Sequence, residues 1–366
     1  MLHADPDIRF DPCASFLCER IAYVFSSNEV ECGVATVGII ANPAAGKDIR
    51  RLIAHASVFD NNEKASIVRR VLLGLEAAGI HDVVMMSDYF GIGRQATDQL
   101  DLALRLTFLD MPLSFTQADS TLAAERMREQ GVECIVTLGG DGTNRAVVKG
   151  CGAIPLVAIS TGTNNVFPRM MEGTTAGLAA AVVARGVVDA SLAIRPTPYL
   201  EVLRDGTWID SALVDVAVSL ERFVGARAVW DESTITQIIL SRPAPGDIGL
   251  SSIGGHLPLD DQETGKGLAL SLGGDAFSVL APIAPGLLRR VGVASYQVLS
   301  PGDTVAIEHT PAILALDGER EITCHAGERF AVRFSEDGPR VVDVRAALRS
   351  AAARGFFVRH EERVDG

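Results

Sequence analysis

A glycine-rich turn between an apolar strand and a helix is the feature that most restricts the fold of this chain. Residues 132–138 are mostly apolar, and the motif GGDGT follows at once at 139–143. Glycine lets the backbone turn sharply and approach a ligand without a Cβ in the way. The free N–H groups at the start of the next helix, together with its dipole, suit a phosphate. The motif therefore predicts a phosphate-binding loop, with a plain tight turn as the alternative.

A second polar loop follows the next apolar strand. Residues 155–159 lead into Ser160 and then into the motif TGTNN at 161–165. Loops at the carboxyl ends of neighbouring parallel strands face the same crevice, which is where open α/β sheets bind ligands. Asn164 and Asn165 offer both donors and acceptors, suited to ribose hydroxyls or an amide edge. Capping of the next helix is the alternative interpretation of these residues.

The end of the first apolar strand, at 34–40, has a weaker phosphate signal. Residues 41–48 nearly match a P-loop, but Ala41 occupies the first glycine position and Asp48 replaces the Ser/Thr that would hold Mg²⁺. We reject the P-loop and keep two interpretations, a phosphate-contacting turn that uses Asn42 and Lys47 or a solvated loop. The motif GIGRQA at 91–96 is predicted to be a surface turn, because a dinucleotide fingerprint belongs after the first strand.

Strands alternate with helices in the first half of the chain and with turns in the second. Strands at 34–40, 83–86, 132–138 and 155–159 alternate with helices at 61–78, 120–130 and 174–185, which predicts a parallel, doubly wound sheet. Beyond about residue 195, short strands, among them two separate strands at 268–272 and 277–280, and an Asp205-Gly206 hairpin turn indicate an antiparallel β-rich half. The expected divisions are an irregular arm at 1–33, an α/β nucleotide-binding domain at 34–194, a β-rich substrate domain at 195–345, and a C-terminal helix and tail at 346–366 that packs back on the first domain.

Composition narrows the classes of partner. The 366 residues carry a formal net charge of −13, which argues against a broad surface for nucleic acid or anionic lipid. No apolar run reaches the roughly 18–20 residues that span a bilayer, and no basic, apolar leader opens the chain. We therefore expect a cytoplasmic protein without a membrane partner. The seven histidines are scattered without metal-ligand spacing, so a zinc site is not expected and any metal ligands stay open.

Taken together, these motifs resemble those of a known superfamily. The glycine loop, the GTNN at 162–165, the Asn42-Pro43 pair with Gly46, and Asp317-Gly318-Glu319 are similar to motifs of the NAD kinases and diacylglycerol-type lipid kinases. Over residues 34–345 the resemblance is strongest to the acetoin catabolism protein X group of ATP-NAD kinase-like proteins. On its own, the Asp-Gly-Glu sequence is typical of a turn between strands.

The resemblance implies an N-terminal α/β nucleotide domain, a C-terminal β-sandwich, and ATP, Mg²⁺ and NAD(H) as ligands. Asp141 matches the aspartate that NAD kinases use at the reacting hydroxyl, whereas lipid kinases place their acid/base group at the positions of Asp317 and Glu319, so the base stays open. The residues expected to bind the cofactor are Asn42, Lys47, Gly139, Gly140, Gly142, Thr143, Asn144, Gly162, Thr163, Asn164 and Asn165.

The expected activity is ATP-dependent phosphorylation of a hydroxyl, with NAD(H) or a related nucleotide as acceptor. Glycine-loop amides, Lys47 and Arg145 would neutralise the developing charge. Two departures from the family pattern keep alternatives open: Asn144-Arg145-Ala146 replaces the Leu-Asn-Glu of lipid kinases, and the Asn-Glu ribose clamp of NAD kinases has no match. The alternatives are a non-catalytic NAD(H)- or ATP-binding regulator of acetoin-type catabolism, then a lipid kinase, and last an oxidoreductase. A homodimer is the default assembly.

Overall fold

The computed structural model describes residues 35–45, 59–98, 100–220, 234–260, 263 and 266–358. The predicted arm at 1–33 and the predicted ligand Lys47 lie outside the described residues.

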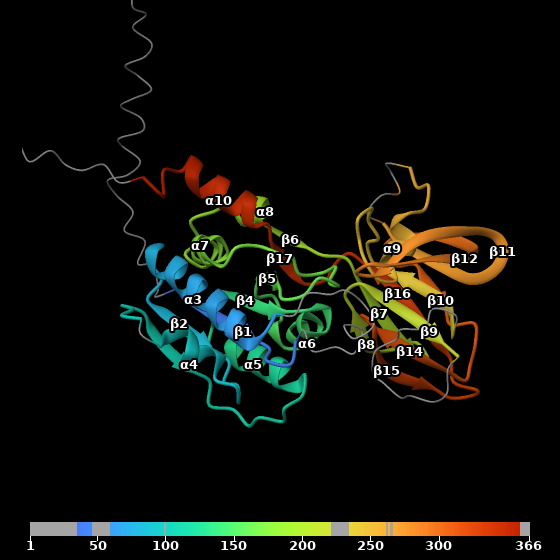
Figure 1. The fold of residues 1–366 in the computed structure, drawn as a ribbon, viewed down its shortest axis with the longest axis horizontal. Coiled ribbons are helices and arrows are strands. Elements are labelled where there is room, and N and C mark those ends of the chain that lie inside the picture. Colours follow the sequence, from blue (N-terminus) through green and yellow to red (C-terminus); the bar gives the residue numbers. More distant parts are fainter. Residues whose placement is uncertain are drawn as a thin grey trace, which may run out of the picture. The chain divides into compact units, whose positions relative to one another are not determined.

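A seven-stranded sheet contains the strands predicted in the first half of the chain (Figure 1). Its order is β3-β2-β1-β4-β5-β17-β6, and the first five of these strands pair in parallel. The order reverses between β1 and β4, the position at which doubly wound sheets bind ligands. The strands are β1 (Thr36–Ala41), β2 (Asp82–Met85), β3 (Arg105–Phe108), β4 (Cys134–Gly139), β5 (Leu156–Ser160), β6 (Ile194–Pro196) and β17 (Arg340–Val342).

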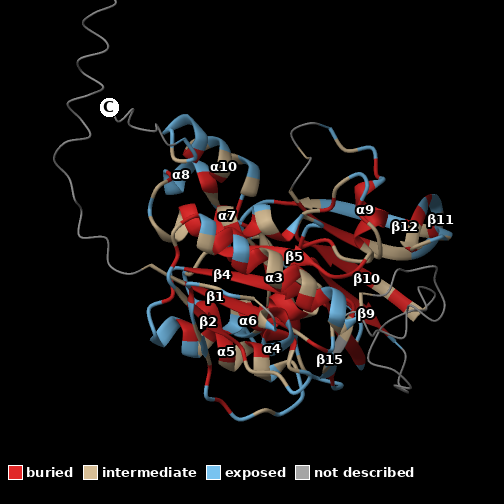
Figure 2. Cartoon of the chain, turned by 60° about the vertical axis from the view of Figure 1, so that its left-hand side comes forward, coloured by how far each residue is buried: buried red, intermediate tan, exposed pale blue. Residues whose placement is uncertain are grey.

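Helices cover both faces of this sheet, which confirms the doubly wound prediction. Every residue of β4 and β5 is buried, and Figure 2 shows these strands as buried between helices with exposed outer faces. One core cluster joins the sheet to α3 (Asn61–Ala77), α4 (Ile92–Thr97), α7 (Gly173–Ala184), α8 (Ala190–Ala193) and α10 (Val344–Ala353). A second cluster joins it to α5 (Ala118–Glu129) and α6 (Asp141–Cys151).

Two predictions about local structure were wrong. Residues 91–96 are not a simple surface turn, because helix α4 begins at Ile92, whose N–H is bonded to the Asp88 carboxylate. Residues 268–272 and 277–280 are not separate strands but parts of one long strand, β11 (Gly267–Ala284). Gly273 and Gly274 have positive φ angles and sit where the pairing register shifts, so they bend the strand without ending it.

The second half of the chain forms two packed antiparallel sheets, which confirms the predicted β-sandwich. The six-stranded sheet has the order β12-β11-β10-β9-β14-β15, and the four-stranded sheet has the order β13-β16-β7-β8. Apolar side chains from both sheets, among them Val202 of β7, Val216 of β9 and Phe334 of β16, share one core. The elements are β7 (Tyr199–Arg204), β8 (Thr207–Ala212), β9 (Asp215–Ser219), β10 (Ile235–Leu240), α9 (Ser251–Gly255), β11, β12 (Leu287–Leu299), β13 (Thr304–Ala306), β14 (Ala312–Leu316), β15 (Glu319–Cys324) and β16 (Phe330–Ser335).

The chain leaves the seven-stranded sheet and later returns to it. β6 precedes the two antiparallel sheets in sequence and β17 follows them, and the two strands pair antiparallel within the first sheet. β17 also pairs in parallel with β5, through Val341 and Leu156. The following helix, α10, contacts α7 and α8.

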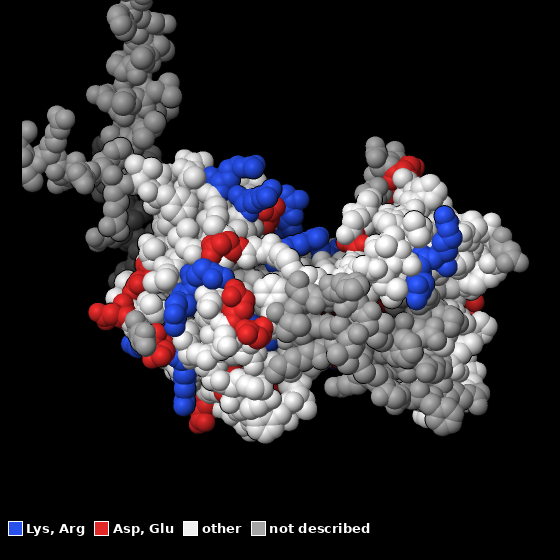
Figure 3. All heavy atoms as spheres, viewed as in Figure 1, with Lys and Arg blue, Asp and Glu red and all other residues white. Residues whose placement is uncertain are grey.

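Surface charge is mixed on the face drawn in Figure 3, where acidic and basic side chains alternate over much of the first half of the chain. Helix α10 differs, because basic side chains gather over it and its Arg345 and Arg349 are exposed. Among the described helices, none is both long and apolar enough to cross a membrane.

Helices α3 and α7 touch through their backbones, which predicts a large effect for a small substitution. A Cβ on Gly177 would lie 2.3 Å from the carbonyl oxygen of Val71. Alanine normally stabilises a helix interior relative to glycine, but here it must push the two helices apart. We expect Gly177→Ala to lower the free energy of unfolding by about 1–3 kcal/mol, measured by urea denaturation. An unchanged or higher stability would contradict this close contact.

Candidate nucleotide site

At two positions of the glycine loop, a side chain would come too close to a neighbouring residue. A Cβ on Gly139 would lie 2.4 Å from the Cβ of Thr143, and one on Gly140 would lie 2.7 Å from the Oδ1 of Asn165. Strand β4 ends at Gly139 and helix α6 starts at Asp141, so the helix N-terminus points out of the sheet edge. The loop therefore presents backbone N–H groups at the position where a phosphate would bind.

The loop that follows β1 is joined to the glycine loop. Asn42 Nδ2 donates to Thr143 Oγ1 at 2.9 Å, and the Asn42 N–H donates to the Leu138 carbonyl at 3.1 Å. Beneath the same loop, the ammonium of Lys64 donates to three of its carbonyls, those of Asn42 (2.9 Å), Pro43 (3.3 Å) and Ala45 (2.6 Å). Two predicted ligand residues, Asn42 and Thr143, are thus brought together at the β1–β4 reversal.

The loop after β5 is the third loop at this edge of the sheet, beside the loops after β1 and β4. Asn165 Nδ2 donates to Ser160 Oγ at 2.8 Å and to the Gly162 carbonyl at 3.3 Å, so its amide stabilises the loop. The oxygens Thr163 Oγ1 and Asn164 Oδ1 are buried and have no hydrogen-bond partner within the described part of the chain. Of the predicted residues in this loop, Thr163 and Asn164 are therefore the ones with polar atoms left for a ligand.

Asn144 has a different place from the one expected of a ligand residue. It is fully buried in α6, where its Oδ1 accepts from Thr137 Oγ1 at 2.7 Å and its Nδ2 donates to the Gly140 carbonyl at 2.9 Å. Its side chain is therefore used to hold the glycine loop onto β4.

Asp141 connects the glycine loop to the loop after β5. Its Oδ1 accepts from the Phe167 N–H at 2.8 Å, and both carboxylate oxygens accept from the Val166 N–H at 3.1 Å. Asp141 is only half-buried, at the first position of α6. A partly exposed carboxylate held by two amides at a helix N-terminus is fixed in direction and still accessible.

Asp317, by contrast, is enclosed. It lies in the turn between β14 and β15 with φ +52°, and its side chain has no exposed surface. Its carboxylate accepts from the N–H groups of Leu213 (3.0 Å), Val214 (2.7 Å) and Asp215 (3.3 Å). Burial raises the pKa of Asp317 above its ordinary value, and Arg145 and the three amides offset part of this effect.

Arg145 is the centre of a buried ion-pair network that joins α6 to the β-rich half. Its guanidinium lies 2.8 Å from Glu321, 3.5 Å from Asp317 and 3.6 Å from Asp210. Burial lowers the pKa of Arg145, but the three carboxylates together outweigh it and raise the pKa. The positive charge expected to act on a phosphate is thus surrounded by three negative charges.

Glu319 lies at the same helix N-terminus as Asp141. Both of its oxygens accept from Gln117 Nε2, at 2.9 Å and 2.8 Å. A Cβ on Gly142 would lie 2.9 Å from Glu319 Oε1, so this glycine makes room for the carboxylate. No group of three or more His, Cys, Asp and Glu side chains with metal-binding geometry occurs among the residues that the structure describes.

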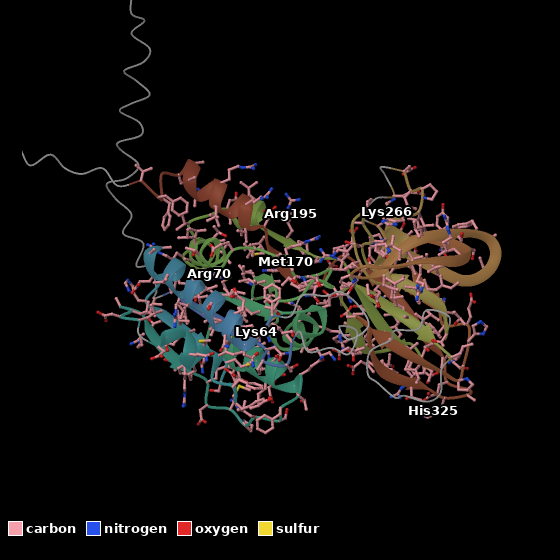
Figure 4. All side chains as sticks on the ribbon, viewed as in Figure 1. Lys64, Arg70, Met170, Arg195, Lys266 and His325 are labelled. Atoms are coloured by element: carbon pink, nitrogen blue, oxygen red, sulfur yellow. The ribbon has the colours of Figure 1, made fainter. Side chains whose placement is uncertain are left out.

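Sequence reasoning missed two residues of this region. Lys64, labelled in Figure 4, is fully buried although it is charged, and Gln117 contacts Glu319, 202 residues away. A signal for Lys64 was present, because it falls on the same helical stripe as Val68, Val71 and Leu75. A lysine on a buried stripe needs acceptors. Gln117 had no comparable signal.

Two family models and a known protein match this chain. Residues 37–187 match the ATP-NAD kinase N-terminal domain, and residues 198–337 match the acetoin catabolism protein X C-terminal domain. The chain is 41% identical over 330 residues to the acetoin catabolism protein X of Cupriavidus necator, covering 86% of this chain and 92% of that protein.

The chain also resembles solved structures at low sequence identity. Yeast NADH kinase complexed with NADH is 13% identical with a TM-score of 0.42, covering 91% of this chain and 90% of that one. A putative diacylglycerol kinase from Bacillus anthracis str. Sterne is 14% identical with a TM-score of 0.38, covering 84% and 98% of the two chains. The identity and coverage with the Cupriavidus protein decide the relationship: this chain belongs to the acetoin catabolism protein X family.

Proposed function

We propose that this protein is an ATP-dependent phosphotransferase that phosphorylates a hydroxyl of NAD(H) or a related nucleotide. The observation that carries the proposal is the position of Asp141, half-exposed at the N-terminus of α6 and held by two amides of the next loop. Three loops, those after β1, β4 and β5, meet there through the Asn42–Thr143, Gly140–Asn165 and Asp141–Phe167 contacts. In doubly wound sheets, nucleotides bind where the loops at the carboxyl ends of neighbouring parallel strands meet.

In this proposal Asp141 is the general base. It accepts the proton of the acceptor hydroxyl as that oxygen bonds to the γ-phosphorus and ADP leaves. A base must come within hydrogen-bond reach of the proton that it takes, and Asp317 has no exposed side-chain surface with which to do so. We therefore assign positioning roles to Asp317 and to Glu319, which lies at the N-terminus of α6. The loop N–H groups stabilise the charge that develops on the transferred group.

Mg²⁺ fits the donors at this position. The ion is usually held by one or two carboxylates together with substrate phosphates and water, and Asp141 and Glu319 supply two carboxylates at the start of α6. Mg²⁺ bound there would neutralise phosphate charge. A dedicated cage of protein ligands is not needed.

A second function is favoured by one observation. Arg145, the basic residue next to the glycine motif, is paired with three carboxylates and so is less able to neutralise a phosphate. This favours a protein that binds NAD(H) or ATP without turnover and regulates acetoin-type catabolism, as the name of the Cupriavidus relative suggests.

The test is phosphoryl transfer by the purified full-length protein. Mg²⁺-ATP is supplied with NAD⁺ or with NADH, and ADP and phosphorylated dinucleotide are measured together. We expect stoichiometric ADP and NADP(H). Tight dinucleotide binding in a titration, with neither product formed, would reject the kinase and support the regulator. ADP formation with another alcohol but with neither dinucleotide would reject the acceptor.

A further inference from the structure

A second arginine, Arg242, lies outside the ion-pair network of Arg145 and has no ion-pair partner among the described residues. Arg242 directly follows β10, and its guanidinium carbon lies 5.3 Å from the ring centroid of Phe167, in the loop after β5. Its Nε is buried without a hydrogen-bond partner, and no carboxylate within the described ranges forms an ion pair with it. Taking a cation out of water without a partner is costly, so such a residue needs an explanation.

The two carboxylates whose charges act on Arg242, those of Asp141 and Asp247, already accept hydrogen bonds from other groups. Asp247 Oδ2 accepts from the Ala244 N–H at 2.9 Å and from Ser251 Oγ at 3.0 Å. Asp141 accepts from the N–H groups of Val166 and Phe167. Neither carboxylate turns toward Arg242 to form an ion pair, although both act on it through space.

A second positive charge reinforces the first. Arg169 lies two residues beyond Phe167, is exposed, and has no ion pair with any described residue. Burial lowers the pKa of Arg242, and the charge of Arg169 lowers it further, against the opposing pull of Asp141 and Asp247. The exposed Arg169 therefore repels the partly buried Arg242 as a like charge, and a bound anion would relieve this repulsion.

The two arginines lie where two loops approach each other beside the proposed base. Arg242 of the 241–250 loop stacks on Phe167, whose N–H holds Asp141. In the same pair of loops, the unpartnered Asn164 Oδ1 lies 3.9 Å from where a Cβ on Gly249 would stand. Arginine is well suited to phosphate, because its planar fork can donate two parallel hydrogen bonds.

We propose that Arg242 and Arg169 form an anion site that binds a phosphate group of the phosphoryl acceptor. Asp141 is next to this site, so a phosphate held there would place the same molecule's hydroxyl near the carboxylate. The identity of the acceptor rests on the proposed function, but anion binding by these two arginines does not.

The first experiment measures binding of inorganic pyrophosphate to the full-length protein by isothermal titration calorimetry, without turnover. We expect Arg242→Met to weaken binding roughly 10- to 100-fold, the range of a lost charge-assisted interaction. Arg242→Lys should retain part of the affinity, since it keeps the charge. Arg195→Met, at an exposed arginine of β6 labelled in Figure 4, should leave it unchanged. Equal affinity of Arg242→Met and wild type would overturn the proposal, as would an equal loss in Arg195→Met.

Stability provides a second readout that a merely structural arginine would not give. Because the ligand-free protein holds Arg242 without an ion pair and without a hydrogen bond at Nε, and methionine can still pack on Phe167, Arg242→Met should leave the Tm unchanged or raise it. A lower Tm with unaltered pyrophosphate binding would assign Arg242 to packing alone and reject the site.

Kinetics with the same variants separates this proposal from the proposed function. Arg242→Met should raise KM for NAD(H) and leave KM for ATP unchanged, and a change confined to ATP would overturn the assignment to the acceptor. If no variant shows kinase activity but pyrophosphate binding still depends on Arg242, the kinase proposal fails and the anion site stands.

Discussion

Replacing Asp317 by alanine is expected to lower the free energy of unfolding by about 3–5 kcal/mol, the usual cost of breaking a buried ion pair. The substitution leaves the N–H groups of Leu213, Val214 and Asp215 without their acceptor. It also removes one of the three carboxylates that balance the buried charge of Arg145. Urea denaturation followed by circular dichroism measures the change.

Asp205 provides a matched control for this substitution. Asp205-Gly206 and Asp317-Gly318 are both two-residue turns with positive φ, 50° and 81° in the first and 52° and 78° in the second. Alanine at either aspartate meets the same backbone strain, but Asp205 is exposed. The difference between Asp317→Ala and Asp205→Ala therefore isolates the buried network. Equal losses from the two variants would show that the turn, and not the network, carries the effect.

Replacing Asp141 by asparagine is expected to reduce kcat by about 10²- to 10⁴-fold, the range supplied by a positioned general base. The asparagine oxygen can still accept from the N–H groups of Val166 and Phe167, so the loops and the Tm should change little. The measurement is the initial rate of NADP(H) formation under saturating ATP and dinucleotide.

Glu319→Gln distinguishes the two carboxylates at the start of α6. Because the carboxylate of Glu319 is already bound by Gln117, we expect a much smaller loss of kcat than for Asp141→Asn. A variant Asp141→Asn that keeps most of the wild-type rate would remove Asp141 from the role of base. A larger loss in Glu319→Gln would transfer that role to Glu319.

Local sequence patterns predicted the elements well and their partners poorly. The apolar strands at β1, β4 and β5, the Asp205-Gly206 hairpin and helix α10 could all be recognised, because apolar period and turn chemistry act over a few residues. The merger of two expected strands into β11 was missed, because glycine within a strand and glycine between strands have the same sequence signature.

The chemistry of the site depended on contacts that no local pattern contains. Arg145 finds Glu321 at a separation of 176 residues, and Gln117 finds Glu319 at 202. The roles of Arg145 and Asn144 as phosphate or cofactor contacts followed from their distance to the glycine motif along the chain. The structure gives Arg145 three carboxylate partners. It gives Asn144 one hydrogen bond to Thr137 of β4 and one to the Gly140 carbonyl. Arg242 was not predicted as a site residue, because a single arginine after an apolar strand is common in sequences of all kinds.

The return of β17 to the first sheet has a consequence for synthesis on the ribosome. The ribosome synthesises β5 long before β17 (Arg340–Val342). While the intervening residues are being made, the edge of β5 that later pairs with β17 through Leu156 has no neighbouring strand. An uncovered strand edge invites pairing with other chains, and β5 is buried along its whole length in the finished protein. The nascent chain therefore passes through a stage in which the α/β half has been synthesised but its sheet is not yet completed by β17, and a chaperone that shields this edge would act during that interval.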